Sequence, residues 1–137
     1  MRDEIVIRLA EDHEGARVGE LVEGMLVHVN MGEIDWSRVF PNWIVAEVGQ
    51  KIVGAIQISL GVPIARMENL SLDKELTGSL KAKVVKALML QGLATLRKSG
   101  AQIITGMVPF SCKKYRKVLE KRGAVRGYAG HTMFMRV

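Results

Sequence analysis

The stretch ENLSLDKELTGSLKA, residues 68–82, decides the fold because it joins a predicted strand to a predicted long helix. The strand covers residues 66–72, and the helix starts in the loop of residues 77–82. A second strand over residues 102–108 and a last helix, which Ser111 can cap, continue the alternation. A strand, a helix and a strand in this order indicate a crossover unit with two parallel strands.

The N-terminal half predicts antiparallel strands. Apolar residues alternate over residues 4–9, which indicates a strand, and Asp12 is placed to cap the helix that follows. Residues 43–47 and 52–58 are spaced as the two strands of a hairpin. These strands precede the crossover, so we expect them to form the antiparallel part of the sheet.

The complete order predicts one α/β domain over residues 1–137. We expect a mixed, mostly antiparallel, twisted sheet with helices on both faces, and residues 124–127 and 131–137 as two further short strands. The apolar fraction of 48% is typical of a globular chain. No run of about 18 uncharged apolar residues occurs, so we expect no membrane partner. The lone Cys112 favours a cytoplasmic protein and excludes an internal disulfide.

Charge is distributed unevenly along the chain. The net charge is +6, but residues 1–73 carry 6 Lys and Arg against 12 Asp and Glu, whereas residues 74–137 carry 14 against 2. One interpretation is that these charges lie on solvated helix faces. The other is that the basic half binds a phosphate-rich partner and the acidic half a cationic one.

The loop of residues 77–82 is placed to bind an anion. Backbone N–H groups at a helix start have no partner within the helix and point at whatever lies above it. Lys81, Lys83 and Lys86 crowd the first turns, where each exposed cation opposes the helix dipole by roughly 0.3–1 kcal/mol. A bound diphosphate would reverse that effect, and solvated lysines on an open face are the alternative.

Three segments follow one another in an order that is informative. They are the hairpin WIVAEVGQKIVG at residues 43–54, the loop at residues 72–82, and LEKRGA at residues 119–124. In this order and spacing they resemble the central hairpin, the acetyl-CoA loop and a late segment of the GCN5-related N-acetyltransferase (GNAT) superfamily. The resemblance covers nearly the whole chain. It implies the acyl-CoA N-acyltransferase fold, with acetyl-CoA as co-substrate.

The loop departs from the family pattern, which is Arg or Gln, two free positions, Gly, one free position, and Gly or Ala. TGSLKA, residues 77–82, keeps the last small residue but has Thr77 for the Arg or Gln and Leu80 for the middle glycine. A leucine there can obstruct a pyrophosphate or forbid a positive φ, so we expect a degenerate acetyl-CoA loop. By the resemblance, the cofactor-binding residues are Leu70, Leu72, Thr77, Gly78, Ser79, Leu80, Lys81, Ala82 and Cys112.

In this family an amine attacks the acetyl thioester directly, which requires a base for the amine and a proton donor for the thiolate. Glu68 is the candidate base, because Glu68 and Leu70 alternate to one face of the predicted strand; a salt bridge is the alternative role. Leu119 stands where many members have a donor tyrosine. Tyr115, four residues earlier on the same helix face, is the candidate donor, or it packs against the sheet.

The acidic half contains a possible acceptor wall, with Glu20, Glu23, Glu33 and Asp35 near Trp36. We expect such a wall to attract a cationic amine. The three histidines have no metal-ligand spacing with one another or with the cysteine, so we predict no metal.

The function that the resemblance implies is acetyl-CoA-dependent N-acetylation of an amine-bearing small molecule or protein. The alternative is a non-catalytic protein of this fold that binds a macromolecule through its charged faces. Nucleic-acid binding by basic residues around the last helix ranks below both, because no helix-turn-helix or aromatic RNA motif is present. A homodimer through residues 131–137 stays open, since exposed strand edges pair readily.

Overall fold

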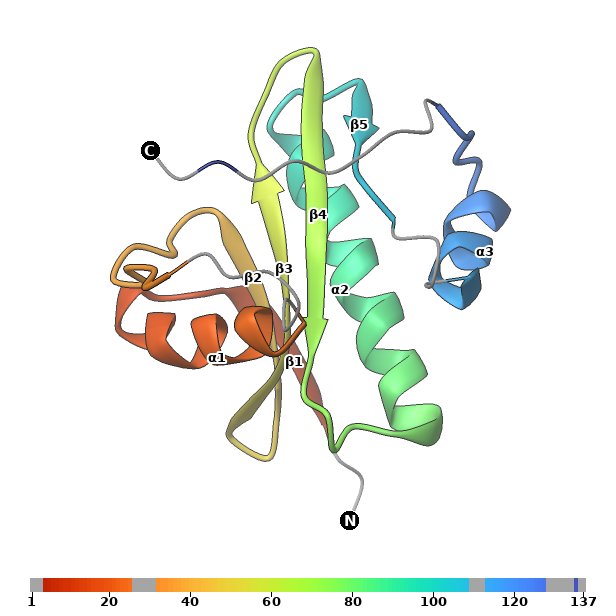
Figure 1. Cartoon of the computed structure of the whole chain (residues 1–137). Helices are drawn as coiled ribbons and strands as arrows, with labels where there is room; N and C mark the ends of the chain where they lie inside the picture. The colour runs from red at the N-terminus through yellow and green to blue at the C-terminus, as the bar shows by residue number, and fades with distance from the viewer. Residues whose placement is uncertain (1–3, 26–31, 109–112, 128–134, 136–137) are drawn as a thin grey trace.

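A computed structural model describes residues 4–25, 32–108, 113–127 and 135 of the 137-residue chain. In chain order the elements are β1 (Ile5–Leu9), the 3-10 helix η1 (Asp12–Glu14), α1 (Gly15–Met25), β2 (Trp43–Val48), β3 (Lys51–Ser59), β4 (Ile64–Leu72), α2 (Gly78–Lys98), β5 (Ile103–Thr105) and α3 (Lys113–Lys121). The strands form one sheet in the order β1-β2-β3-β4-β5 (Figure 1). The first four strands are antiparallel, and β4 and β5 are a parallel pair joined by α2. The predicted mixed, mostly antiparallel sheet is therefore confirmed.

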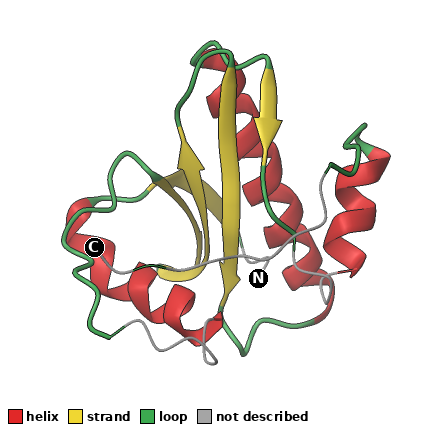
Figure 2. Cartoon of the chain, turned by 45° about the horizontal axis from the view of Figure 1, so that its top comes forward, coloured by secondary structure: helices red, strands yellow, loops and turns green. Residues whose placement is uncertain are grey.

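Helices cover both faces of the sheet, as expected. Figures 1 and 2 show α1 on one face and α2 on the other, and α1 packs on β3 and β4 while α2 packs across β1 to β4. The α2-side core consists of Ile44, Ala46, Val53, Ile56, Ile58, Ala65, Met67, Leu76, Val84, Leu88, Met89 and Leu96. The α1-side core consists of Ala10, Val18, Leu21, Val22, Val39, Trp43, Val45, Ile52 and Ala55.

Two glycines bring α2 close to the sheet. A Cβ at Gly54 would lie 3.0 Å from Leu88 Cδ1, and a Cβ at Gly92 would lie 2.5 Å from Met67 Sδ. Side chains at these positions would push the helix away from the strands. The start of α2 is thus fixed relative to β4, which matters for the site described below.

The segment between α1 and β2 is held on α1 by Trp36. A Cβ at Gly19 would lie 2.4 Å from the Trp36 ring, and a Cβ at Gly15 would lie 1.6 Å from the Trp36 carbonyl oxygen. The indole Nε1–H donates to Glu23 Oε1 at 3.0 Å, and the ring meets Trp43 edge-on with centroids 5.9 Å apart. The two glycines of α1 therefore provide the space in which Trp36 packs.

Asp12 has a role that the sequence did not predict. It does not cap its own helix, because η1 begins after Glu11; instead Asp12 Oδ1 accepts the N–H groups of Val39 at 2.8 Å and Phe40 at 2.9 Å. The bonds from Phe40 and Val39 lower the pKa of the Asp12 carboxyl. Asp12 thus joins the segment before β2 to the start of the first helix.

The C-terminal predictions were less accurate. β5 is shorter than the strand predicted over residues 102–108, and Ile103 is exposed to solvent at its start. The strand predicted over residues 124–127 was wrong: these residues are irregular and exposed, and Ala124 N–H bonds back to Leu119 O at 3.1 Å as part of the α3 terminus. Residues 131–137 lie outside the described residues except for residue 135. None of the helices in the described part of the chain is long and apolar enough to cross a bilayer.

Candidate functional site

A bulge in β4 marks the centre of the candidate site. Between the pairs Ala55–Ser71 and Gln57–Glu68, β4 has one residue more than β3. Asn69 takes up the extra length with a φ of 57°, the left-handed region that asparagine tolerates better than most residues. Bulges re-aim side chains and are common beside active sites.

Two side chains hold this bulge. Ser71, the only buried polar residue in the described part of the chain, donates its hydroxyl to the Asn69 carbonyl at 3.1 Å. Asn69 Nδ2 donates to Gln57 Oε1 on β3 at 2.7 Å. A buried hydroxyl with a partner stabilises the local backbone, so the left-handed conformation is fixed from both strands.

β4 loses its neighbour next to the bulge. The parallel pairing with β5 ends at Arg66–Thr105, and a Cβ at Gly106 would lie 2.1 Å from the Met67 carbonyl oxygen, so the backbones still touch there. Beyond that point β4 continues while the chain turns away to α3 (Figure 1). Within the described ranges, no strand pairs with residues 67–72 on that edge. The backbone there is placed to pair with an extended ligand.

Asp73 fixes the loop that follows β4. Its carboxylate accepts from Arg17 Nη2 on α1 at 2.5 Å, from Lys51 Nζ at 3.2 Å, and from the Glu75 N–H at 2.9 Å. The bond from Glu75 N–H, followed by that from Arg17, lowers the pKa of Asp73 to about 2. The guanidinium also donates through Nε to the Ile52 carbonyl at 3.0 Å. The loop before α2 is therefore fastened to both α1 and the β2–β3 turn.

The start of α2 provides free backbone donors. The first helical hydrogen bond runs from Lys81 N–H to Thr77 O at 3.3 Å, and the Thr77 side chain makes no cap. The N–H groups of Gly78, Ser79 and Leu80 thus have no helical carbonyl to bond, and Thr77 to Ser79 are exposed. Gly78 has a φ of 64° with open space around its Cα, as expected for glycine in a tight loop.

Leu80 packs into the core next to the loop. Among the described residues, the left-handed conformation occurs at Gly78 and not at Leu80. The Leu80 side chain is half-buried and packs against the α2-side core. The degenerate character of the acetyl-CoA loop stays a prediction.

The cations beside these donors have no counter-ions. Lys81, Lys83 and Lys86 are exposed, and within the described ranges none of them makes an ion pair. No acidic residue lies in the first turn of α2. Free N–H groups, the positive end of a helix and unpaired lysines form a donor set that fits a phosphate group. The chemistry of the loop thus matches the diphosphate of a CoA molecule, and Ala82 is exposed beside it.

Glu68 lies on the α1-side face of β4. Its carboxylate pairs with Arg66 Nη2 at 3.1 Å, and its side chain is 21% exposed, against 59% for Arg66. The bulge separates Glu68 from Leu70, because Leu70 and Leu72 pack against the α2-side core on the other face. The expectation that Glu68 and Leu70 share a face was wrong, since one extra residue in β4 inverts the alternation.

Tyr115 lies on α3, half-buried against the α2-side core together with Val118 and Leu119. This agrees with the expected packing and with the shared helix face of Tyr115 and Leu119. Figures 1 and 2 both show α3 beside α2 and away from α1. Cys112 and the expected helix cap at Ser111 lie outside the described residues.

The acidic side chains of the proposed acceptor wall have structural partners. Glu23 accepts from Trp36, Glu20 pairs with Arg17 at 3.0 Å, and Asp35 accepts the Ser37 N–H at 2.9 Å. These contacts are exposed, so each is weak and open to competition from a ligand.

A second network holds β1 to η1 and β2. Arg8 donates to both carboxylate oxygens of Glu14 at 2.6 and 2.7 Å and to Glu47 at 3.0 Å. The bond from Arg8 is the main cause that lowers the pKa of Glu14 to about 2. Glu47, the acidic residue of the β2–β3 hairpin, is thereby part of a structural ion pair.

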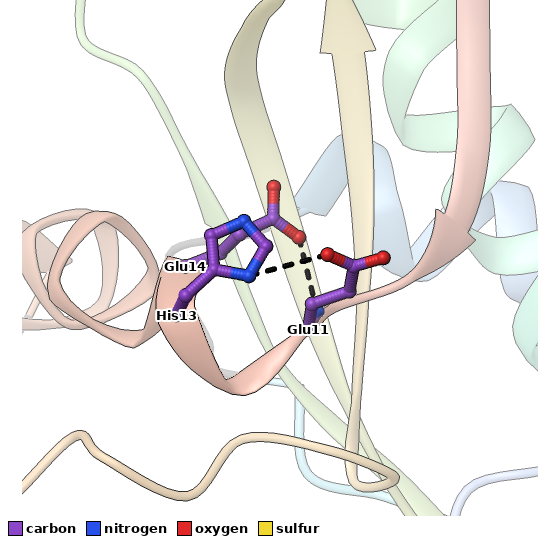
Figure 3. A group of neighbouring side chains, drawn as sticks. All are labelled: Glu11, His13 and Glu14. Carbon is purple, nitrogen blue, oxygen red and sulfur yellow. Dashed lines mark hydrogen bonds and ion pairs between the residues drawn. The ribbon is translucent and has the colours of Figure 1, made fainter.

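Glu11, His13 and Glu14 lie together at the turn into α1 (Figure 3). His13 Nδ1 is 3.2 Å from Glu11 Oε2, and Glu14 Oε1 accepts the Glu11 N–H at 3.0 Å. Glu14 also accepts from Arg8 through both oxygens, so its carboxylate is part of the contacts that hold β1 to η1. The group has the form of a helix-start capping arrangement.

Sequence reasoning missed the residues that hold the loop and the bulge in place. Asn69 carried a weak signal, because asparagine in a strand is unfavourable and tolerates the left-handed region. Gly106, directly after a short apolar run, signalled a close backbone approach. The bond between Arg17 and Asp73 joins residues 56 positions apart and had no signal in a single sequence.

No protein-family model matches the sequence, and neither does any curated protein sequence. Solved structures do match. A transcriptional regulator from Bacillus halodurans C-125 superposes with a TM-score of 0.74 and 16% identity over 96% of this chain and 100% of its own. Ribosomal-protein-alanine N-acetyltransferase from Brucella melitensis biovar Abortus 2308 gives 0.73 and 12% over 96% and 100%. Rv2747 from Mycobacterium tuberculosis, in complex with CoA, gives 0.60 and 18% over 82% and 69%.

At these identities the matches establish the fold and nothing finer. The chain has a GNAT-like fold, with a five-stranded mixed sheet and helices on both faces.

Proposed function

We propose that this protein transfers an acetyl group from acetyl-CoA to an amine by direct attack of the amine. The observation that carries the proposal is the start of α2, where the free N–H groups of Gly78, Ser79 and Leu80 adjoin three unpaired lysines. Similarity in fold to an N-acetyltransferase and to a protein solved with CoA supports the assignment. The acceptor is an amine carried by a small molecule or a protein.

The chain's own residues would hold the cofactor in two places. The N–H groups at residues 78–80, with Lys81 nearby, would bind the diphosphate. The unpaired edge of β4 at Leu70 and Leu72 would pair with the extended arm. Acetyl-CoA, when bound, supplies a thioester whose carbonyl carbon the amine attacks, while the bond to sulfur breaks and sulfur leaves as thiolate.

Glu68 would take the proton that the amine nitrogen loses as the new N–C bond forms. Its pairing with exposed Arg66 is compatible with this role, because an exposed ion pair contributes only about 0–1 kcal/mol and a cationic amine can replace Arg66. Tyr115 would donate a proton to the departing thiolate from α3. Glu23 and Asp35 lie on the α1 side and would favour cationic acceptors.

Cofactor binding is tested with a matched pair of glycine variants. Gly78 and Gly49 both have positive φ, 64° and 57°, and neither would meet an atom within 4 Å through a new Cβ. Gly78→Ala and Gly49→Ala should therefore lose similar stability, about 1 kcal/mol each. Calorimetry with CoA should show about tenfold weaker binding only for Gly78→Ala. Equal affinities in both variants, or no CoA binding by the unmodified protein at millimolar concentration, would contradict the proposal.

Turnover is tested separately by following free thiol released from acetyl-CoA in the presence of simple amines. Glu68→Gln should lower kcat by roughly a hundredfold or more while leaving CoA affinity unchanged. Arg66→Gln is the control, since it removes the ion pair and retains the base. Tight CoA binding without thiol release for any amine would favour the second candidate, a non-catalytic protein of this fold that binds a macromolecule through its charged faces.

A further inference from the structure

α3 has two faces of opposite character. Its apolar stripe, Tyr115, Val118 and Leu119, packs against the α2-side core. On the other side of the helix, four lysines are exposed to solvent. We call this set the α3 lysine face; it consists of Lys113, Lys114, Lys117 and Lys121.

The α3 lysine face has no counter-ion among the residues that the structure describes. The only acid of α3, Glu120, is shared by Arg116 at 3.7 Å and Arg126 at 3.2 Å. In the part of the chain that the structure describes, no carboxylate pairs with any of the four lysines. The residues outside that part contain a single acid, Asp3. The charge of this face is therefore left for an external anion.

The arrangement is unfavourable for the isolated helix. Lys113, Lys117 and Lys121 follow one another at i, i+4 and i+8, and like charges at that spacing destabilise a helix by about 0.2–0.5 kcal/mol per pair. No acidic residue lies in the first turn, where the helix dipole disfavours cations. A bound polyanion would attract these lysines and so offset both their mutual repulsion and their unfavourable interaction with the helix dipole. We propose that the α3 lysine face binds the phosphate backbone of a nucleic acid without regard to base sequence.

A nucleic acid fits this face better than a protein or a membrane. Protein interfaces are depleted of lysine and depend on buried aromatic or apolar anchors, and this side of α3 has neither. A basic helix that lies on a membrane inserts its apolar side, but here that side is packed against the protein's own core. Flexible lysines that neutralise phosphates need no base contacts. The sequence alone could not separate these cases, because it did not show which side of the helix is covered.

The α3 lysine face is separate from the proposed cofactor loop. The loop is formed by the start of α2, with Lys81, Lys83 and Lys86. The inference does not depend on acetyl transfer, and the two sites can be tested independently with CoA as a competitor.

The test uses fluorescence anisotropy of a short labelled single-stranded RNA with the full-length protein. Binding should weaken steeply between about 50 and 200 mM salt. Lys117→Gln/Lys121→Gln should weaken binding at the lower salt by about tenfold or more. It should also reduce the magnitude of the salt slope by roughly 1.4, since each single-strand phosphate contact contributes about 0.7.

The matched control is Arg97→Gln/Lys98→Gln, which removes the same charge from exposed residues at the far end of α2. This control variant should bind the RNA with nearly the affinity and the salt dependence of the unmodified protein. Saturating CoA should not displace the RNA. An equal loss in both double variants would show a general effect of net charge and overturn the proposal. So would binding of polyglutamate or of phosphatidylserine vesicles as tight as that of the RNA, or no RNA binding at the lower salt. Circular dichroism of each variant confirms that α3 remains folded.

Discussion

Charged side chains around α1 and those around α2 and α3 differ in whether they form ion pairs. Around α1, carboxylates are paired: Asp73 with Arg17 and Lys51, and Glu14 with Arg8. Around α2 and α3, the lysines at the helix starts are exposed, and none of them makes an ion pair within the residues that the structure describes. The paired charges fix segments to one another, and these lysines take no part in such contacts there. This difference separates structural electrostatics from charge that is available to a ligand.

We expect a charge change to alter the free energy of unfolding more strongly when the charge is well paired. Changes to the α1 side should alter the free energy of unfolding strongly. Changes to the lysines of α2 and α3 should alter ligand binding and leave the fold intact.

The largest expected effect is a loss of stability at low pH. The pKa of Glu14 is lowered from 4.5 to about 2, mainly by Arg8, and that of Asp73 from 3.8 to about 2, mainly by the Glu75 N–H and Arg17. Each group binds fewer protons when folded, so its stabilisation is complete above about pH 4.5 and is lost as the pH falls toward 2. Together they should lower the free energy of unfolding by about 3 kcal/mol over that window, after allowance for solvent screening.

Urea unfolding at a series of pH values measures this effect. Glu14→Gln should be less stable than the unmodified protein at neutral pH and should depend less on pH below about 4.5. A stability that stays constant down to pH 3 would mean that these ion pairs do not hold the α1 side together.

The second-largest expected effect is the loss of stability when the negative charge of Asp73 is removed. Asp73→Asn keeps an acceptor for the Glu75 N–H but removes the carboxylate charge that pairs with Arg17 and Lys51, and the Asp73 side chain is only 12% exposed. Removing one partner of a largely buried, charged hydrogen bond should cost about 2 kcal/mol. Glu75→Gln is the control, because it removes the same charge from an exposed neighbour and should change stability by less than about 0.5 kcal/mol. Similar losses in both would show that net charge, not pairing, matters here.

These residues also show what one sequence can and cannot predict. The order and the type of the main elements followed from apolar periodicity and from the spacing of the predicted strands, because those signals are local. The candidate loop followed from its place between a strand and a helix. The bulge at Asn69 and the Arg17–Asp73 bond did not, because they depend on tertiary contacts between distant residues. The packing of Leu80 against the α2-side core has the same origin.

A smaller effect tests packing on the α1 side without a change of charge. Gly19→Ala would place a Cβ 2.4 Å from the Trp36 ring, so Trp36 must shift, at a cost of about 1–2 kcal/mol. Gly24→Ala, on the same helix, meets only the end of the Lys74 side chain at 3.8 Å. It should be neutral or stabilising by up to about 1 kcal/mol, because alanine is the better helix former.

Thermal unfolding of the two variants, with tryptophan fluorescence to follow Trp36, checks this pair. Equal stability of Gly19→Ala and Gly24→Ala would show that Trp36 does not pack into the space over Gly19. The bonds of Asp12 to Val39 and Phe40 would then be the main link between residues 36–40 and the start of the first helix.

The smallest effect concerns the α3 lysine face. Lys117→Gln removes a cation that lies one turn from Lys113 and Lys121 and has no ion pair in the described part of the chain. Relief of two like-charge contacts should raise the free energy of unfolding by a few tenths of a kcal/mol at low salt. The gain should shrink as salt screens the lysines in the unmodified protein. A loss above about 1 kcal/mol would mean that Lys117 is bonded within the fold. In that case the charges around α3 would be structural, as those around α1 are, and the contrast between the two sides would fail.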